Sequence, residues 1–374
     1  MKILSAPKKV SLEITNLCNL NCKHCNVADT KNAPGDLTTE EWKNFIDECA
    51  RLKVFRFIMS GGEPFMRPDI RELIDHIFSY HFRLHINTNG TLIDKYMANY
   101  LSRYKRIETV QVSIDGSCPE THEKIRPAGS FDKATRGIKN LLEHNVPTIT
   151  FSCITTHNID DMENIIKLGK KLGVHSCNFT SFLPVGYCRN HINTLIISPK
   201  QEQELLETVK SLKEKYGNYI SGPLINEESF MRTFKEYSVK NYDPEKCYMT
   251  SCNGGIEDCS VRPDGWVIPC SRLWEYKTGN IKEQSLYDIW HNSKEMNELR
   301  SRREKKINNM PECHKCEYMP LCRGGCPAIP FDYEKGITGW DPTSCYKVHT
   351  GEKESYITKS KTRDNRLIRN SPRR

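Results

Sequence analysis

Short β-rich runs alternate with helical stretches through residues 10–216, and this alternation limits the chain to parallel β/α architectures. The predicted strands are Val10–Thr15, Val54–Ser60, Arg83–Thr88, Thr109–Ile114, Thr148–Ile154 and Ser176–Phe182. The predicted helices cover residues 38–52, 68–79, 94–103, 131–144, 159–172 and 198–216. Successive units of this kind form a parallel sheet with right-handed crossovers, and ligands bind at the carboxyl ends of its strands. Six units are too few for the closed eight-fold barrel.

Three cysteines, Cys18, Cys22 and Cys25, follow directly after the first predicted strand, where a parallel β/α sheet collects its ligands. A structural zinc site closes on four protein ligands, and an iron–sulfur cube held by protein alone takes four cysteines. A compact set of three therefore leaves one metal corner open for a group that is not protein.

The whole chain holds 17 cysteines in 374 residues, which is an odd and unusually large number. The N-terminus, residues 1–7, has too short an apolar stretch for a secretory signal, and no segment approaches the length that crosses a bilayer. We therefore expect a soluble, cytoplasmic protein. Because the cytosol keeps thiols reduced, its clustered cysteines are better interpreted as metal ligands than as disulfides.

The formal net charge of +8 is concentrated at the C-terminus. Residues 351–374 contribute +5, and the other 350 residues contribute only +3, so the main body carries no strong signal for nucleic-acid binding. We predict a β/α core over 1–216, a connector over 217–246, a small cysteine-rich domain over 247–350 and a basic, disordered tail over 351–374. The cysteine-rich segment has few stretches of periodic hydrophobic residues and so little core, and we expect it to need bound metal to be ordered.

The spacing Cys18-x3-Cys22-x2-Cys25 resembles that of the radical S-adenosylmethionine (SAM) superfamily, and a second family motif follows the second strand at Gly61, Gly62, Glu63 and Pro64. The resemblance implies an open, partial (β/α)6 barrel. It also implies a [4Fe–4S] cluster whose fourth iron is chelated by SAM, with the Gly-Gly-Glu-Pro segment binding the methionine ammonium. Glycines let backbone carbonyls approach a ligand closely, and a carboxylate attracts a cationic group.

Polar residues at later strand ends give weaker matches to the same family. Thr88 and Ser113 occupy positions at which the family contacts SAM, and Arg126 resembles an arginine that reaches the SAM carboxylate. Each is also compatible with an ordinary turn or surface residue. Cys188, just past the sixth strand, is a candidate hydrogen-atom donor to a substrate radical, although a free cysteine is usually a small buried hydrophobe.

The C-terminal cysteines are similar in spacing to the SPASM extension of radical SAM peptide maturases, which binds two auxiliary [4Fe–4S] clusters. Carried over, this resemblance assigns one cluster to Cys252, Cys259, Cys270 and Cys326. It assigns the other cluster to Cys313, Cys316, Cys322 and Cys345. Cys247 competes with Cys259 for a place in the first set. Two zinc ribbons are the alternative for these eight cysteines.

The resemblance implies an α/β radical SAM/SPASM oxidoreductase that cleaves SAM reductively to a 5′-deoxyadenosyl radical. The leading hypothesis is oxidative modification of a ribosomally made peptide, such as crosslinking. A discrete leader-recognition protein and an electron donor such as flavodoxin or ferredoxin are the expected partners. Sulfatase maturation is disfavoured, because Ser271 stands where that branch has an aspartate.

Two alternatives remain open at this point. Radical oxidation or decarboxylation of a small molecule, such as a tetrapyrrole, uses the same residues. A zinc-stapled nucleic-acid-binding protein with a basic tail is the alternative outside the enzymes, and it leaves Gly61–Pro64 without a role.

Overall fold

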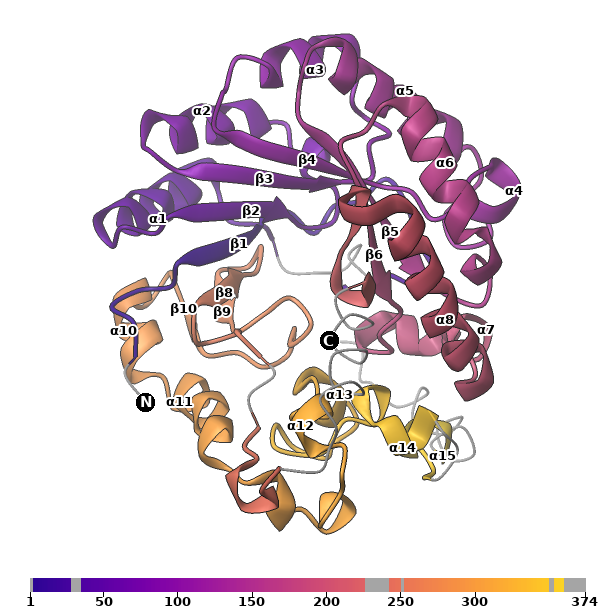
Figure 1. The fold of residues 1–374 in the computed structure, drawn as a ribbon. Coiled ribbons are helices and arrows are strands. Elements are labelled where there is room, and N and C mark those ends of the chain that lie inside the picture. The colour runs from indigo at the N-terminus through magenta and orange to yellow at the C-terminus, as the bar shows by residue number, and fades with distance from the viewer. Residues whose placement is uncertain (1–2, 28–34, 226–241, 250–251, 350–352, 360–374) are drawn as a thin grey trace. The chain divides into compact units, whose positions relative to one another are not determined.

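The alternating pattern folds into a ten-stranded sheet within the described part of the computed structural model (Figure 1). The structure describes residues 3–27, 35–225, 242–249, 252–349 and 353–359. The strands are β1 (Lys9–Glu13), β2 (Arg56–Ser60), β3 (Arg83–Thr88), β4 (Ile107–Ser113), β5 (Thr148–Ile154), β6 (Cys177–Ser181), β7 (Ile220–Ser221), β8 (Asp258–Val261), β9 (Trp266–Ile268) and β10 (Gly279–Asn280).

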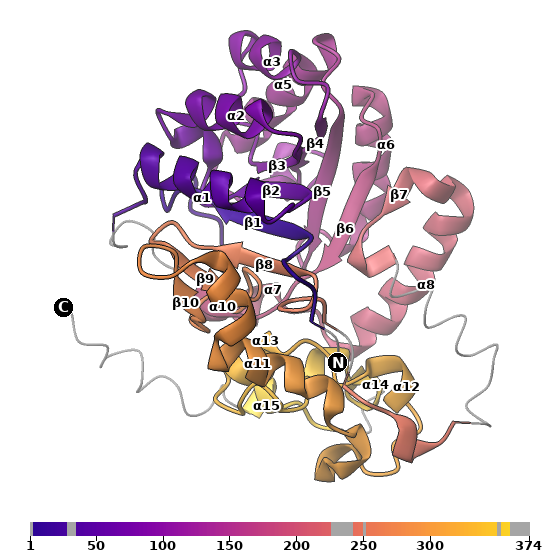
Figure 2. The same ribbon diagram turned by 90° about the vertical axis from the view of Figure 1, so that its left-hand side faces the viewer.

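The strands lie side by side in the order β10-β9-β8-β1-β2-β3-β4-β5-β6-β7. Neighbours from β8 through β7 run parallel, whereas β9 and β10 are antiparallel additions at one edge. Strand β8 lies alongside β1, with Val10 opposite Cys259 (Figure 2). Because these strands are parallel, the carboxyl ends of β1 to β6 lie on the same side of the sheet, and the site lies at these strand ends.

Helices connect successive parallel strands and lie along the outer side of the sheet, as α1, α2, α3, α5 and α6 show in Figure 1. The helices up to residue 216 are α1 (Thr39–Arg51), α2 (Ile70–Ser79), α3 (Lys95–Leu101), α4 (Pro119–His122), α5 (Ser130–Glu143), α6 (Met162–Leu172), α7 (Ile192–Leu195) and α8 (Pro199–Tyr216). Helix α1 starts with a capping box in which Thr38 and Glu41 satisfy each other's backbone N–H groups.

The two faces of the sheet differ in polarity. The side chains under the helices are buried and apolar, and they include Phe57, Met59, Leu84, Ile86, Val110 and Val112. The alternate residues of the same strands line a cavity with polar side chains, and they include Ser60, Asn87, Gln111 and Ser113. Because side chains alternate along a strand, each strand supplies the core on one face and the site on the other.

Contacts divide the chain into two compact units. The larger unit contains the sheet and covers Met1–Ile196, Val209–Ser229 and Asn253–Arg300. The smaller unit covers Ile197–Thr208, Phe230–Cys252 and Ser301–Arg374. The later helices are α10 (Leu286–Asn292), α11 (Lys294–Ser301), α12 (Met319–Cys322), α13 (Ala328–Asp332), α14 (Tyr346–His349) and α15 (Tyr356–Lys359). No helix in the described part of the chain is long and apolar enough to span a membrane.

The predicted strands and helices of the β/α core are confirmed to within a few residues at each end. The sequence pattern missed β7 and the addition of β8 to β1, because strands of two to four residues carry too little periodicity. The prediction of a disordered tail was wrong for Tyr356–Lys359, which forms α15. Tyr356 packs there against Trp340 and Tyr333. Most of the predicted connector, residues 226–241, and residues 360–374 of the tail lie outside the described residues.

Substitution of Leu12 tests whether β1 contributes to the buried core of the sheet. Leu12 is 1% exposed on a strand that pairs with both β2 and β8. Leu12→Ala should lower the free energy of unfolding by about 2–5 kcal/mol, because it leaves a cavity in the core. Anaerobic urea unfolding gives the value, and Leu92→Ala, at a position that is 38% exposed, is the matched control. Equal effects of the two substitutions would contradict this view of the core.

Candidate functional site

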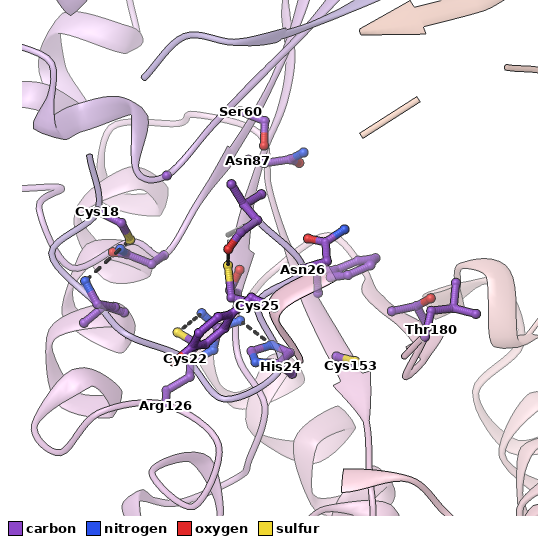
Figure 3. Close-up of a pocket in the computed structure, with 18 of the residues that line it drawn as sticks. Cys18, Cys22, His24, Cys25, Asn26, Ser60, Asn87, Arg126, Cys153 and Thr180 are labelled. Atoms are coloured by element: carbon purple, nitrogen blue, oxygen red, sulfur yellow. Dashed lines mark hydrogen bonds between the residues drawn. The ribbon is translucent and has the colours of Figure 1, made fainter. Parts of the chain in front are cut away.

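A cavity of about 610 Å³ opens at the carboxyl ends of the parallel strands of the larger unit. This volume lies within the range of about 300–1,000 Å³ that is typical of small-molecule and cofactor sites. The three-cysteine loop forms one side of the cavity, and residues in or near β2 to β6, together with Arg126 and Arg272, form the rest. Figure 3 shows Cys18, Cys22 and Cys25 along this loop, with Ser60 and Asn87 at the strand ends.

The three thiols line the cavity while remaining largely shielded from solvent. Burial raises the pKa of Cys22 to about 12, although the Arg126 guanidinium opposes that shift. Burial also raises the pKa values of Cys18 and Cys25. A thiolate at these positions therefore needs a compensating positive charge, which a bound metal cluster supplies.

The glycine pair after β2 lets the three-cysteine loop approach the sheet edge. A Cβ atom on Gly61 would lie 2.7 Å from the Thr15 carbonyl oxygen, and one on Gly62 would lie 2.2 Å from that of Leu17. The Gly62 N–H donates to the Thr15 carbonyl at 2.8 Å, and the Glu63 N–H donates to the Leu17 carbonyl at 2.7 Å. Any larger residue would push away the segment that leads into Cys18.

The Glu63 carboxylate lies beneath the glycine pair and does not line the cavity. It accepts hydrogen bonds from the Thr88 hydroxyl and the Asn89 N–H, both at 2.7 Å. Burial raises the pKa of Glu63 to about 7 against these hydrogen bonds. Glu63 and Thr88 therefore join the ends of β2 and β3, and Pro64 begins the short turn Pro64–Met66 that follows.

A buried ion pair supports the three-cysteine loop from β4. The Arg126 Nε donates to the Asp115 carboxylate at 2.6 Å, and both side chains are at most 9% exposed. The other Arg126 nitrogens lie 3.7 Å from the Cys22 sulfur and 3.3 Å from the His24 Nε2. Burial raises the pKa of Asp115, but the Arg126 guanidinium and His24 lower it by more, so the net shift is downward. Arg126 is therefore a fixed cation beside the thiols (Figure 3).

The far wall of the cavity comes from β5, β6 and the segment after β9. Cys153 and Thr180 line it and lie on the other side of the loop from Cys18 in Figure 3. Ser113 and Arg272 also line the cavity. Neither Arg272 nor Cys153 was singled out from the sequence, because only the strand register shows that they share a wall.

The candidate hydrogen donor Cys188 is placed behind this wall. Cys188 is 0% exposed and packs with Phe182 and Leu195. Its thiol donates to the Leu183 and Val185 carbonyls at 3.3 and 3.0 Å, and it does not line the cavity. The thiol that reaches the cavity is Cys153, which packs against the same apolar cluster.

The smaller unit brings together the four cysteines that were predicted for one auxiliary cluster. Cys313, Cys316, Cys322 and Cys345 all line one small cavity. The side chains of Trp340 and Asp341 line the same cavity. Burial raises the pKa values of Cys313, Cys322 and Cys345, as it does for the thiols of the larger unit.

The four cysteines that were predicted for the other auxiliary cluster are divided between the two units. Cys252 and Cys326 belong to the smaller unit, where the buried Arg302 guanidinium interacts electrostatically with both thiols. Cys270 belongs to the larger unit and accepts a hydrogen bond from the Arg272 N–H at 3.3 Å. Among the described residues, no three His, Cys, Asp or Glu side chains converge on a single metal ion. In a cube the thiolates bind different irons, so such convergence is not required.

Cys259 differs from these cysteines in its surroundings. It is 1% exposed in β8, directly opposite Val10 of β1, so its side chain shares the core face of the sheet with that residue. Its thiol interacts with Cys49 of α1, and burial raises the pKa of Cys259. The competing residue Cys247 lies in the smaller unit and packs beside Cys313 and Cys316.

Comparison with known proteins decides the family. The model of the radical SAM superfamily matches residues 12–169, and that of an iron–sulfur cluster-binding domain, SPASM, matches residues 252–317. The chain is also 31% identical to the AdoMet-dependent heme synthase of Methanosarcina barkeri, over 86% of this chain and 91% of that protein. The chain is a member of the radical SAM superfamily.

Two further proteins are similar to this radical SAM protein over most of its length. The mycofactocin maturase MftC of Mycobacterium tuberculosis is 29% identical over 93% of this chain and 85% of its own length. The structure of Streptococcus suis SuiB bound to the precursor peptide SuiA has a TM-score of 0.73. It covers 92% of this chain and 77% of SuiB at 18% identity, so this likeness shows the fold.

The residues that line the cavity fit the cofactors of this family, which are SAM and [4Fe–4S] clusters. Three thiols on one loop, of which Cys22 is buried and the other two are partly buried, offer three of the four iron ligands that a cube needs. The glycine pair leaves backbone rather than side chains at the adjoining cavity edge, and Arg126 supplies a cation there. We expect Cys18, Cys22 and Cys25 to hold the cluster that binds SAM.

The pH dependence of stability tests the buried carboxylates. Burial raises the pKa of Glu13 to about 7, against a hydrogen bond from Ser60. The folded state then keeps a proton that the unfolded state has released, so the free energy of unfolding falls as pH rises from about 4.5 to about 7. Burial also raises the pKa of Glu63 to about 7. Glu13→Gln should therefore remove about half of the fall in the free energy of unfolding. Anaerobic urea unfolding across this range measures it.

Glu40→Gln is the matched control for Glu13→Gln, because Glu40 is an exposed carboxylate on α1. It should leave the pH dependence unchanged. A fall in stability that is the same in wild type and Glu13→Gln would contradict the raised pKa.

The environment of Cys259 predicts a packing role rather than a ligand role. Cys259→Ala should therefore keep the full iron content of the anaerobically prepared protein. Cys316→Ala, which changes one of the four cysteines around the smaller cavity, should lose about four irons. Iron and sulfide analysis of both variants gives the answer, and loss of about four irons from Cys259→Ala would restore Cys259 as a ligand.

Proposed function

We propose that this radical SAM enzyme oxidatively modifies a ribosomally made peptide in the cytoplasm, for example by crosslinking. The observation that carries the proposal is the shape of the main cavity. Its cofactor side, at Cys18, Gly61 and Gly62, leaves a second wall at Cys153 and Thr180 for a substrate. The relatives named as a maturase and as an enzyme bound to its precursor peptide support a peptide as that substrate.

The cluster and SAM, when bound, supply the electron and the 5′-deoxyadenosyl radical that removes a hydrogen atom from a substrate C–H bond. The residues of the chain position and shield this chemistry. Cys18, Cys22 and Cys25 would hold the cluster. Ser113 and Arg126 line the cavity and would contact the polar groups of SAM. Phe151 and Phe182 line the cavity and keep water from the reacting atoms.

The smaller unit would supply the route for electrons leaving the substrate. Cys313, Cys316, Cys322 and Cys345 would hold one auxiliary cluster. Cys252, Cys270 and Cys326 would belong to the other. We propose a discrete leader-recognition protein and an electron donor such as flavodoxin or ferredoxin as partners. A cytoplasmic location suits both, because low-potential clusters depend on a reducing compartment.

A small-molecule substrate is the second candidate. The relative named as an AdoMet-dependent heme synthase supports oxidation or decarboxylation of a tetrapyrrole by the same cavity. The family assignment leaves the zinc-stapled nucleic-acid-binding protein without support.

Substitution of the three cysteines of this loop tests the proposed function. Anaerobically prepared wild type should contain about twelve irons per chain, falling to about eight in the Cys18/Cys22/Cys25→Ala variant. Only the wild type should form 5′-deoxyadenosine from SAM and a reductant. Cys49→Ala, which changes a buried core cysteine of α1, is the control and should match wild type. Zinc with little iron, or undiminished 5′-deoxyadenosine from the triple variant, would refute the proposal.

A further inference from the structure

The wall of the main cavity contains an arginine whose charge is not balanced there. Arg272 lies between β9 and β10, is partly buried and lines the cavity. Its backbone N–H donates to the Cys270 sulfur at 3.3 Å. That contact uses only the backbone, so it leaves the guanidinium available and is preserved when the side chain is changed.

The other arginines of this region have acidic partners. Arg126 pairs with Asp115 at 2.6 Å, and Arg262 pairs with Asp264 at 2.8 Å. Within the described residues, the side chain of Arg272 makes no ion pair or hydrogen bond, and the cavity lining contains no aspartate or glutamate. The Arg272 charge also opposes the rise that burial causes in the pKa of Cys153, which lines the same cavity. A planar guanidinium with five N–H donors matches a carboxylate better than any neutral group.

The position of Arg272 distinguishes it from the residues expected around SAM. It shares the far wall with Phe151, Cys153 and Phe182, whereas Cys18 and the glycine pair form the cofactor side. Arg126 already provides a cation on the cofactor side. One arginine balances one negative charge, which suits a carboxylate on a carbon skeleton rather than a doubly charged phosphate.

We propose that Arg272 binds a carboxylate group of the substrate and so orients it in the cavity. The carboxylate belongs to a peptide, at its C-terminus or on an acidic side chain, or to a carboxylated small molecule such as a tetrapyrrole. This inference rests on the proposed function, because it takes the cavity to be the substrate site. It adds that a substrate lacking a free carboxylate is bound poorly.

Binding to the SAM-loaded holoenzyme, without reductant, tests the inference separately from turnover. One pair of probes is coproporphyrin III and its tetramethyl ester, followed by porphyrin absorbance. The other is an octapeptide pool and the same pool methyl-esterified at every carboxyl group, followed by ultrafiltration and mass spectrometry. The variants are Arg272→Gln and Arg272→Lys. Arg136→Gln is the control, because it removes the same charge from an exposed position on α5.

The wild type should prefer the free acid over the ester in one pair of probes, and that pair identifies the source of the carboxylate. Arg272→Gln should weaken binding of the acid about ten- to a hundredfold and abolish the preference. Arg272→Lys should keep part of it, and Arg136→Gln should keep all of it.

Three results would overturn the inference: no preference for the acid in wild type, unchanged acid binding by Arg272→Gln, or a loss of SAM affinity in that variant in place of probe affinity. The last result would assign Arg272 to SAM. Failure of the proposed function has a different signature, because it appears as absence of 5′-deoxyadenosine and of the expected iron rather than as altered probe binding.

Discussion

The buried pair of Asp115 and Arg126 is the interaction on which the site depends. The Asp115 carboxylate also accepts a hydrogen bond from the Cys153 N–H at 2.8 Å. The backbone N–H of Asp115 donates to His122 Nδ1 at 3.1 Å. The pair therefore ties the end of β4 to β5, to the segment before Arg126 and to the three-cysteine loop. Two buried charges need each other in such a place, because either one alone would carry the full cost of leaving water. The thiols thus lie beside a fixed positive charge.

The cavity divides into two chemically distinct sides because the sheet places different strands around it. The early strands present backbone at Gly61 and Gly62, next to the thiols. The later strands present Phe151, Cys153 and Thr180. The proposed cofactor and substrate sites therefore belong to different parts of one continuous sheet, which keeps them rigid relative to each other. This arrangement lets enzymes of one family vary the substrate while the cofactor side stays the same.

Much of this could be predicted from the sequence, for reasons that are local. A repeating β/α pattern and good helix starts such as Thr38 located the six core units. The three-cysteine loop was predictable because it follows directly after β1. The pairing of β8 with β1 was not, because it joins residues far apart in the chain through a strand of four residues. The core position of Cys259 followed from that pairing, so the spacing of cysteines by itself could not reveal it.

The sequence by itself determined the family, the parallel β/α class and the clustering of the cysteines, since these follow from residue types at short spacings. Tertiary structure decided which side chains face one another. It buried Glu63 outside the cavity while its hydrogen-bond partner Thr88 lines the cavity, and it placed the thiol of Cys153 rather than that of Cys188 at the cavity wall, together with Arg272. The reason is physical: the direction of a side chain depends on strand register and on the neighbours it packs against, and both are set by contacts between residues distant in sequence.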